Sequence, residues 1–154
     1  TETDVKVPAN VSAGEPGYEE RAIYEMGLTG SDSININNED FSNINVTDQV
    51  TSTISHPAVK TLLSTLDKQD IPVEINSLFR TAKHNTKEGG VLNSMHTKGL
   101  AFDVAGDEQD GNIQKIINYV KNNPTIRQEG KEYTIEAIYH DNHLHVELTS
   151  PIIS

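Results

Sequence analysis

Two segments far apart in the chain contain most of the side chains that can bind a metal ion. The first holds His96 and Asp103, and the second, near the C-terminal end, holds His143 and His145. Hydrolytic zinc sites commonly use three nitrogen or oxygen ligands from the protein and leave one position for water. The chain has no cysteine, which excludes thiolate ligands, thiolate nucleophiles and disulfides. Any metal must therefore be held by histidines and carboxylates.

Alternating apolar and polar residues predict that each segment contains a β-strand. In a strand over residues 100–104, the bulky apolar side chains share one face and Asp103 lies on the other. In a strand over residues 143–148, leucines and a valine occupy one face. The opposite face of this second strand carries His143, His145 and Glu147.

Spacing alone does not decide which of His143 and His145 binds a metal ion, because both imidazoles share a face and both can reach it. A single histidine is more often a surface or hydrogen-bonded residue than a ligand, so neither segment is decisive by itself. Together they favour a metal site, and the small residues Gly99 and Ala101 allow a backbone or a substrate to approach closely.

Hydrophobic spacing predicts two amphipathic helices elsewhere in the chain. The first begins with Ser55 as its cap and ends before Pro72, and the second follows Gly111 or Asn112 and ends before Pro124. Their apolar positions are Val59, Leu62, Leu63 and Leu66 in the first helix and Ile113, Ile116, Ile117 and Val120 in the second.

Period-two alternation predicts strands over residues 73–77, 100–104, 133–139 and 143–148, the last two joined as a hairpin. Residues 30–48 also contain alternating isoleucines, but they are rich in Asn, Asp and Ser, so a surface loop is favoured over short strands. The order of helix, strand, loop, strand, helix and hairpin indicates an α+β domain with a small, mostly antiparallel sheet and flanking helices.

The acidic charge of the chain is concentrated at its N-terminal end. Residues 1–50 hold ten acidic residues against two basic ones, and they are polar, with glycine and proline near the start. We therefore expect an acidic, polar extension or arm over residues 1–50 and a separate domain over residues 51–154, which contains both candidate metal-binding segments. Because only 34% of the residues are hydrophobic, we expect the core to be small for the length of the chain.

The charge balance also excludes several classes of partner. The formal net charge is −11 and no basic cluster is present, which argues against binding to nucleic acid or to an anionic membrane surface. No apolar run approaches the roughly 20 residues that a membrane span needs. We expect neither nucleic-acid binding nor membrane insertion, and the sequence does not indicate an oligomeric state.

The two metal-binding segments resemble those of a known family. The pattern Ser-x-His-x-x-Gly-x-Ala-x-Asp at residues 94–103, followed by His-x-His at residues 143–145, is similar to the zinc D-alanyl-D-alanine carboxypeptidases and L-alanyl-D-glutamate endopeptidases of bacterial cell-wall metabolism. Their fold is shared with the signalling domain of hedgehog proteins. Residues 77–81 resemble the Ser-Gly-Tyr-Arg-Ser/Thr segment of these enzymes, although Leu78 replaces the usual glycine. The resemblance covers residues 55–150 and implies that the domain over residues 51–154 is a zinc peptidase domain.

This resemblance implies one zinc ion per chain and a role for each residue of the motifs. It implies that His96, Asp103 and His145 are the metal ligands and that His143 is the catalytic residue that helps to activate water. It also implies that Arg80 binds substrate or stabilises the developing oxyanion, a task suited to a permanently charged, forked donor.

Other polar residues near the motifs are expected to assist the site or to surround it. Ser94 resembles a residue that hydrogen-bonds the substrate peptide. Asp141 and Glu147 are expected to orient the imidazoles by hydrogen bonds to their ring nitrogens, although solvated carboxylates in a turn and a strand are at least as good an interpretation. We expect His84 and His140 to be surface or substrate-rim residues.

The expected function is zinc-dependent hydrolysis of peptide bonds in peptidoglycan stem peptides by a metal-activated water, as an endopeptidase or a DD-carboxypeptidase. The expected place of action is the bacterial cell wall, for a bacterial or phage-encoded protein. The alternative is a non-catalytic metal-containing module of the same fold, acting in binding or as a structural component. His143 and Arg80 beside three ligand positions favour the enzyme, because a purely structural metal site needs neither.

Overall fold

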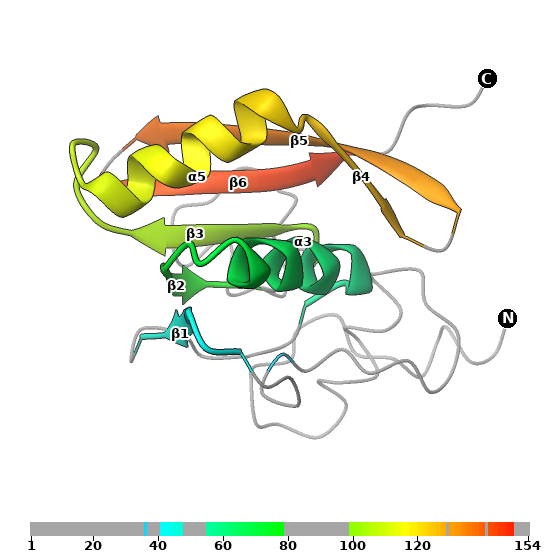
Figure 1. Cartoon of the computed structure of the whole chain (residues 1–154), viewed down its shortest axis with the longest axis horizontal. Coiled ribbons are helices and arrows are strands. Elements are labelled where there is room, and N and C mark those ends of the chain that lie inside the picture. The colour runs from blue at the N-terminus through cyan, green and yellow to red at the C-terminus, as the bar shows by residue number, and fades with distance from the viewer. Residues whose placement is uncertain are drawn as a thin grey trace, which may run out of the picture.

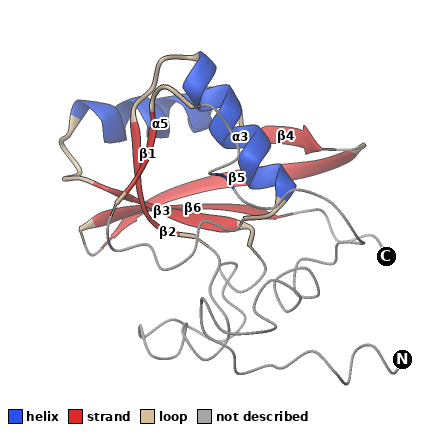
Figure 2. Ribbon diagram, turned by 90° about the horizontal axis from the view of Figure 1, so that it is seen from below, coloured by secondary structure: helices blue, strands red, loops and turns tan. Residues whose placement is uncertain are grey.

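The computed structural model describes six ranges of the chain, namely residues 36, 41–47, 55–78, 99–128, 130–140 and 142–149. These described residues form one sheet with both of their helices on the same face, in two layers (Figures 1 and 2). The elements are β1 (Ile44–Val46), α3 (Pro57–Lys68), β2 (Val73–Ser77), β3 (Ala101–Ala105), α5 (Gly111–Asn122), β4 (Thr125–Gln128), β5 (Lys131–His140) and β6 (His143–Thr149).

The sheet formed by the described residues has six strands in the order β1-β2-β3-β6-β5-β4. β1 pairs with β2 in parallel, and every other neighbouring pair is antiparallel. The α+β class predicted from the sequence is confirmed. The predicted small, mostly antiparallel sheet is corrected to a mixed six-stranded one, because β1 and β4 were not predicted as strands.

β1 is held at the edge of the sheet by backbone hydrogen bonds and by one carboxylate. Val73 N–H donates to the carbonyl oxygen of Asn43 at 2.9 Å, which extends the pairing of β1 with β2. Asp67 of α3 accepts hydrogen bonds from the backbone N–H groups of Ser42 and Asn43 at 2.9 and 2.6 Å. These contacts explain why a strand forms where the polar composition favoured a loop. The predicted division of the chain at residue 50 stays a prediction, although β1 precedes it and belongs to the sheet.

α3 is capped by His56 and not, as predicted, by Ser55. His56 has extended backbone angles, φ −65° and ψ 145°, and its Nδ1 accepts a hydrogen bond from the N–H of Ala58 at 3.0 Å. An unprotonated imidazole nitrogen thus replaces the hydroxyl oxygen that usually caps a helix. The backbone N–H of His56 also donates to the carbonyl oxygen of Gly99 at 2.9 Å, which ties the start of α3 to the chain just before β3.

α5 begins and ends close to the predicted positions. Its cap is Asp110, whose carboxylate accepts a hydrogen bond from the N–H of Asn112 at 2.8 Å. The helix ends at Asn122, shortly before Pro124, as a proline two residues beyond a helix end predicts. Neither helix of the described part of the chain is long and apolar enough to cross a membrane.

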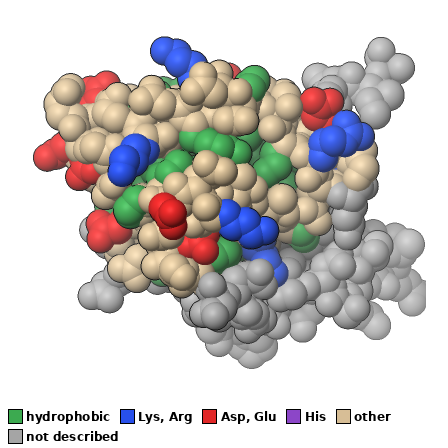
Figure 3. Space-filling view, in the orientation of Figure 1, with side chains coloured by type: hydrophobic (Ala, Val, Ile, Leu, Met, Phe, Trp, Pro, Cys, Tyr) green, Lys and Arg blue, Asp and Glu red, His purple; other side chains and the backbone are tan. Residues whose placement is uncertain are grey.

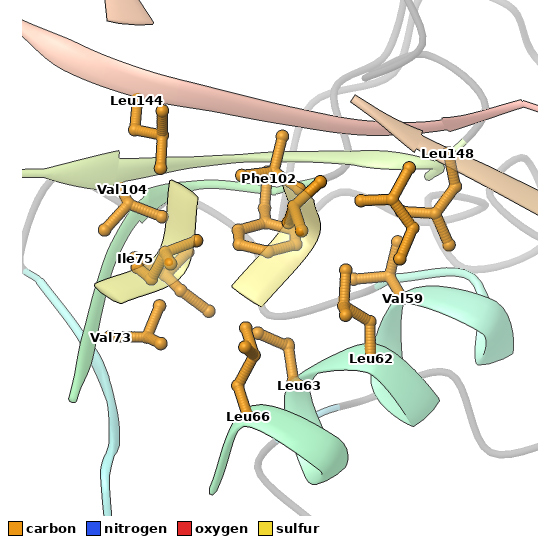
Figure 4. Packing of buried hydrophobic residues seen from close by; sticks show 14 of the residues in the cluster. Val59, Leu62, Leu63, Leu66, Val73, Ile75, Phe102, Val104, Leu144 and Leu148 are labelled. Atoms are coloured by element: carbon orange, nitrogen blue, oxygen red, sulfur yellow. The ribbon is translucent and has the colours of Figure 1, made fainter. Parts of the chain in front are cut away.

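The hydrophobic core lies between the two helices and one face of the sheet. Figure 4 shows Leu62, Leu63 and Leu66 of α3 pointing toward Phe102 of β3, which is fully buried. Apolar residues alternate along the strands, so every second side chain enters this core. The sheet residues buried here are Val73, Ile75, Phe102, Val104, Tyr133, Ile135, Leu144, Val146 and Leu148.

We predict that Phe102→Ala lowers the free energy of unfolding by about 3–5 kcal/mol, because it leaves a cavity where an aromatic ring fills the core. Thr134→Ala, at an exposed position of β5, is the matched control and is expected to change it by about 0.5 kcal/mol or less. Urea unfolding of both variants measures the difference. Equal urea midpoints for Phe102→Ala and the unsubstituted protein would show that Phe102 does not fill the core.

Candidate metal site

The sheet face opposite the helices carries the predicted site. Residues directly paired across antiparallel strands point to the same side of the sheet. Pairing of β3 with β6 and of β6 with β5 therefore builds three rows on this face, which we call the site face. The rows are Ala101, Glu147 and Glu136; Asp103, His145 and Ile138; and Ala105, His143 and His140. On the helix side, the view in Figure 3 shows no histidine side chain among the described residues.

Asp103 and His145 form the central contact of the site face. Their Cα atoms are paired across β3 and β6, and the Nδ1 of His145 lies 3.0 Å from the Oδ1 of Asp103. Asp103 is only 5% exposed. A buried carboxylate is costly unless it is paired with a positive charge, a hydrogen-bond donor or a metal, so this position needs a partner in every state of the site.

The other two polar residues of β6 lie on either side of His145. The Nε2 of His145 is 2.9 Å from the Oε1 of Glu147, so both ring nitrogens of His145 face a carboxylate. His143 is more distant from Asp103, with 3.7 Å between its Nε2 and the same Oδ1. The two histidines that spacing alone did not distinguish therefore lie at different distances from Asp103.

The surroundings of His145 change its pKa. Burial lowers the pKa of His145, but the hydrogen bonds to Asp103 and Glu147 and the charges of both carboxylates outweigh burial, so its pKa is raised above the usual value. Without a metal, a protonated imidazole donates through both nitrogens. The raised pKa favours the protonated form of His145 at the position where the resemblance predicts a metal ion.

The chemistry of this donor pair fits zinc. Zinc binds histidine nitrogen and carboxylate oxygen at about 2.0–2.2 Å, so two such ligands of a tetrahedral site lie about 3.3 Å apart. The separation of 3.0 Å between His145 Nδ1 and Asp103 Oδ1 needs only a small adjustment. Within the described ranges alone, no group of three histidine, aspartate or glutamate side chains is placed to hold a metal.

The remaining predicted site residues do not all fall in the described part of the chain. Asp103, His143, His145 and Glu147 are described, and they lie together on the site face. Arg80, Ser94, His96 and Asp141 lie outside the described residues, as does His84. The predicted third ligand, His96, is thus the residue on which completion of the site depends.

His140, expected to be a surface or substrate-rim residue, is exposed and lies beside His143 and His145. Its ring centroid is 4.7 Å from that of His143 and 6.3 Å from that of His145. The sequence contained a signal for this placement, since His140 and His143 flank a two-residue hairpin loop and so must pair directly. Asn142 in that loop has φ 72°, which such tight turns require.

A comparison with known proteins identifies the family of the chain. A family model described as Peptidase M15 matches residues 32–147. The chain belongs to the peptidase M15 family. This confirms the resemblance to zinc D-alanyl-D-alanine carboxypeptidases. Members of the M15 family are metallopeptidases that generally depend on zinc. The matched range contains both M15-like segments, and a search of curated proteins finds no match.

The raised pKa of His145 predicts a pH-dependent stability of the metal-free M15 chain. The folded state holds a proton on His145 that the unfolded state releases near pH 6.5, so the contribution is complete below about pH 6.5 and is lost as pH rises through the raised pKa. Urea unfolding in a chelator should therefore give a higher midpoint near pH 6 than near pH 8.5.

His145→Gln is the control for this measurement, because it replaces the imidazole with an amide that can form hydrogen bonds but is not protonated in this pH range. The pH dependence between pH 6 and pH 8.5 should be weaker in this variant. If the urea midpoint depends equally steeply on pH in both proteins, a titratable group other than His145 causes the pH dependence.

Proposed function

We propose that this chain is a zinc peptidase that hydrolyses peptide bonds in peptidoglycan stem peptides, as an endopeptidase or as a DD-carboxypeptidase. The observation that carries the proposal is the contact of Asp103 with His145, with His143 beside them on the same sheet face, in a chain of the M15 family. The family supports peptide hydrolysis with a metal. The peptidoglycan substrate is the more specific part of the proposal.

His96, Asp103 and His145 are the proposed ligands of one zinc ion. The nitrogen of His145 that faces Asp103 is Nδ1, and its proton must leave before a metal can bind there. Nε2 keeps its hydrogen and donates it to Glu147. Glu147 is therefore proposed to fix the ring orientation and tautomer of His145 through this hydrogen bond. For Asp141, orientation of an imidazole is proposed from the sequence alone.

His143 is the proposed catalytic residue. It lies on the site face next to the ligand pair, yet its Nε2 is farther from Asp103 than the Nδ1 of His145 is. An imidazole titrates near neutral pH and can accept a proton from water and give it to the leaving amine. Zinc, when bound, would lower the pKa of a water ligand and polarise the scissile carbonyl.

Arg80 and Ser94 complete the proposed constellation. A guanidinium keeps its charge at all relevant pH values and presents forked donors, which suits an oxyanion or a substrate carboxylate. A serine hydroxyl can both donate to and accept from a peptide backbone. The roles proposed are substrate binding and oxyanion stabilisation for Arg80 and a hydrogen bond to the peptide for Ser94.

A non-catalytic metal module of the same fold is the second candidate. Asp103, His145 and a third ligand are enough to hold a structural metal, and they favour this candidate and the enzyme equally. His143 separates the two, because a structural site has no use for an additional imidazole at 3.7 Å from a ligand carboxylate. We therefore propose the enzyme.

The enzyme is tested with the zinc-loaded protein and purified peptidoglycan. We predict new amino or carboxyl termini in the stem peptides and a rate about 100-fold or more lower for His143→Ala, the range that general acid–base residues contribute. Zinc content should be unchanged in this variant. Stoichiometric zinc without any new stem-peptide termini would refute the enzyme and favour the structural module, and failure to bind zinc would refute both.

Glu147 has a separate predicted effect on the metal. Glu147→Gln keeps the size of the side chain but weakens its hydrogen bond with His145, so zinc affinity should fall about 10- to 100-fold. Competition with a chromogenic chelator measures this affinity. Glu136→Gln, at the paired position of β5, is the matched control. Equal zinc affinities of the two variants would remove Glu147 from the proposed site.

A further inference from the structure

One column of the site face has no role in the proposed chemistry. Glu136, Ile138 and His140 of β5 lie beside the polar residues of β6, and all three are exposed. Ile138 is 54% exposed and is the only large hydrophobic side chain among the described residues with such exposure. A single exposed apolar residue is common on protein surfaces and by itself indicates no function. A function for Ile138 must therefore be inferred from its position relative to the proposed metal ligands.

Ile138 lies in the same row as the proposed metal ligands. Its Cα atom is paired with that of His145, which is in turn paired with Asp103. Neighbouring strands are about 4.8 Å apart, so the side chain of Ile138 stands one strand from His145 on the same face. A peptide whose scissile bond lies at the proposed metal position would therefore place a neighbouring side chain over Ile138.

The neighbours of Ile138 limit the size of the side chain that it can receive. Glu136 and His140 flank it on the same face, each about 6.8 Å away along the strand. The apolar surface is thus one residue wide, with a carboxylate at one end and an imidazole at the other. A methyl group can be covered by Ile138 alone, whereas an aromatic side chain would also cover Glu136 or His140 and remove water from a polar group.

His140 marks the end of this column that lies nearest to the proposed catalytic residue. Its ring packs edge-to-face against His143, with 4.7 Å between the centroids. The other end of the column is negatively charged, because Glu136 of β5 is paired there with Glu147 of β6. The acidic groups of a stem peptide are therefore expected to face the His140 end, where they avoid repulsion by the two glutamates.

We propose that Ile138, flanked by Glu136 and His140, is a specificity-determining residue that contacts a small aliphatic side chain next to the scissile bond. The inference rests on the proposed function and deepens it. An alanine flanks each of the bonds under consideration, the L-alanyl-D-glutamate bond and the D-alanyl-D-alanine bond. The same contact thus serves the endopeptidase and the carboxypeptidase.

The kinetic test compares Ile138→Thr with the unsubstituted zinc enzyme. Threonine keeps the β-branched shape that suits a strand but replaces apolar surface with a hydroxyl. On a stem peptide, kcat/KM should fall about tenfold, mainly through KM, as expected for the loss of about one methylene-sized apolar contact. On an analogue with glycine in place of the alanine beside the cleaved bond, the two proteins should differ by less than about twofold.

Thr134→Ala, farther along β5, is the matched control and should leave both substrates unaffected. The ratio of kcat/KM on the alanine peptide to kcat/KM on the glycine peptide should be lower in Ile138→Thr. The same ratio in both proteins would refute the proposed role of Ile138.

A binding measurement separates this inference from the proposed function. In zinc-loaded His143→Ala, the δ1-methyl NMR resonance of Ile138 should shift saturably when an alanine-containing stem peptide is added, while that of Ile126 on β4 stays in place. A shift without hydrolysis by the unsubstituted enzyme would support the contact and refute the peptidase. Hydrolysis without a shift would refute the contact alone, and the absence of both would refute both.

Discussion

The antiparallel pairing of β3 with β6 is the constraint on which the site depends. It places Asp103 opposite His145, although the two residues are 42 positions apart in the chain. Backbone hydrogen bonds hold this register, and β2 and β5 support the pair from either side. The separation of 3.0 Å between carboxylate and imidazole is therefore set by two rigid central strands and not by a loop, which is how a metal site is held in position.

The register of β3 and β6 also determines which of their side chains enter the hydrophobic core. Phe102 and Val104 fill the space under the helices because Asp103, between them, points the other way. A shift of one residue would turn the carboxylate into the core and expose the apolar side chains. Hydrophobic burial thus stabilises the register in which Asp103 meets His145, and the free energy of the core maintains the geometry of a site that contributes few apolar contacts itself.

The charges around His145 connect the folded chain with its proposed chemistry. Two carboxylates face the two ring nitrogens, which raises the pKa of His145 in the absence of a metal. A zinc ion would take the place of one proton while leaving the Glu147 contact intact. In a chain of the M15 family, this exchange of a proton for a metal is our proposed reason for a buried carboxylate on the sheet face opposite the helices.

Local pattern was enough to predict both helices, four of the six described strands and the face on which each polar residue lies, because side-chain direction follows from the periodicity of helix and strand. The motif also identified the family. Tertiary structure alone decided the partners. β1 forms in a polar segment because Val73 and Asp67 hydrogen-bond its neighbours, and His56 replaces Ser55 as the cap of α3. Spacing along the strand did not distinguish His145 from His143, and the resemblance alone gave them different roles. Strand pairing adds their distances to Asp103, because periodicity defines a face but not the distance to a residue on another strand.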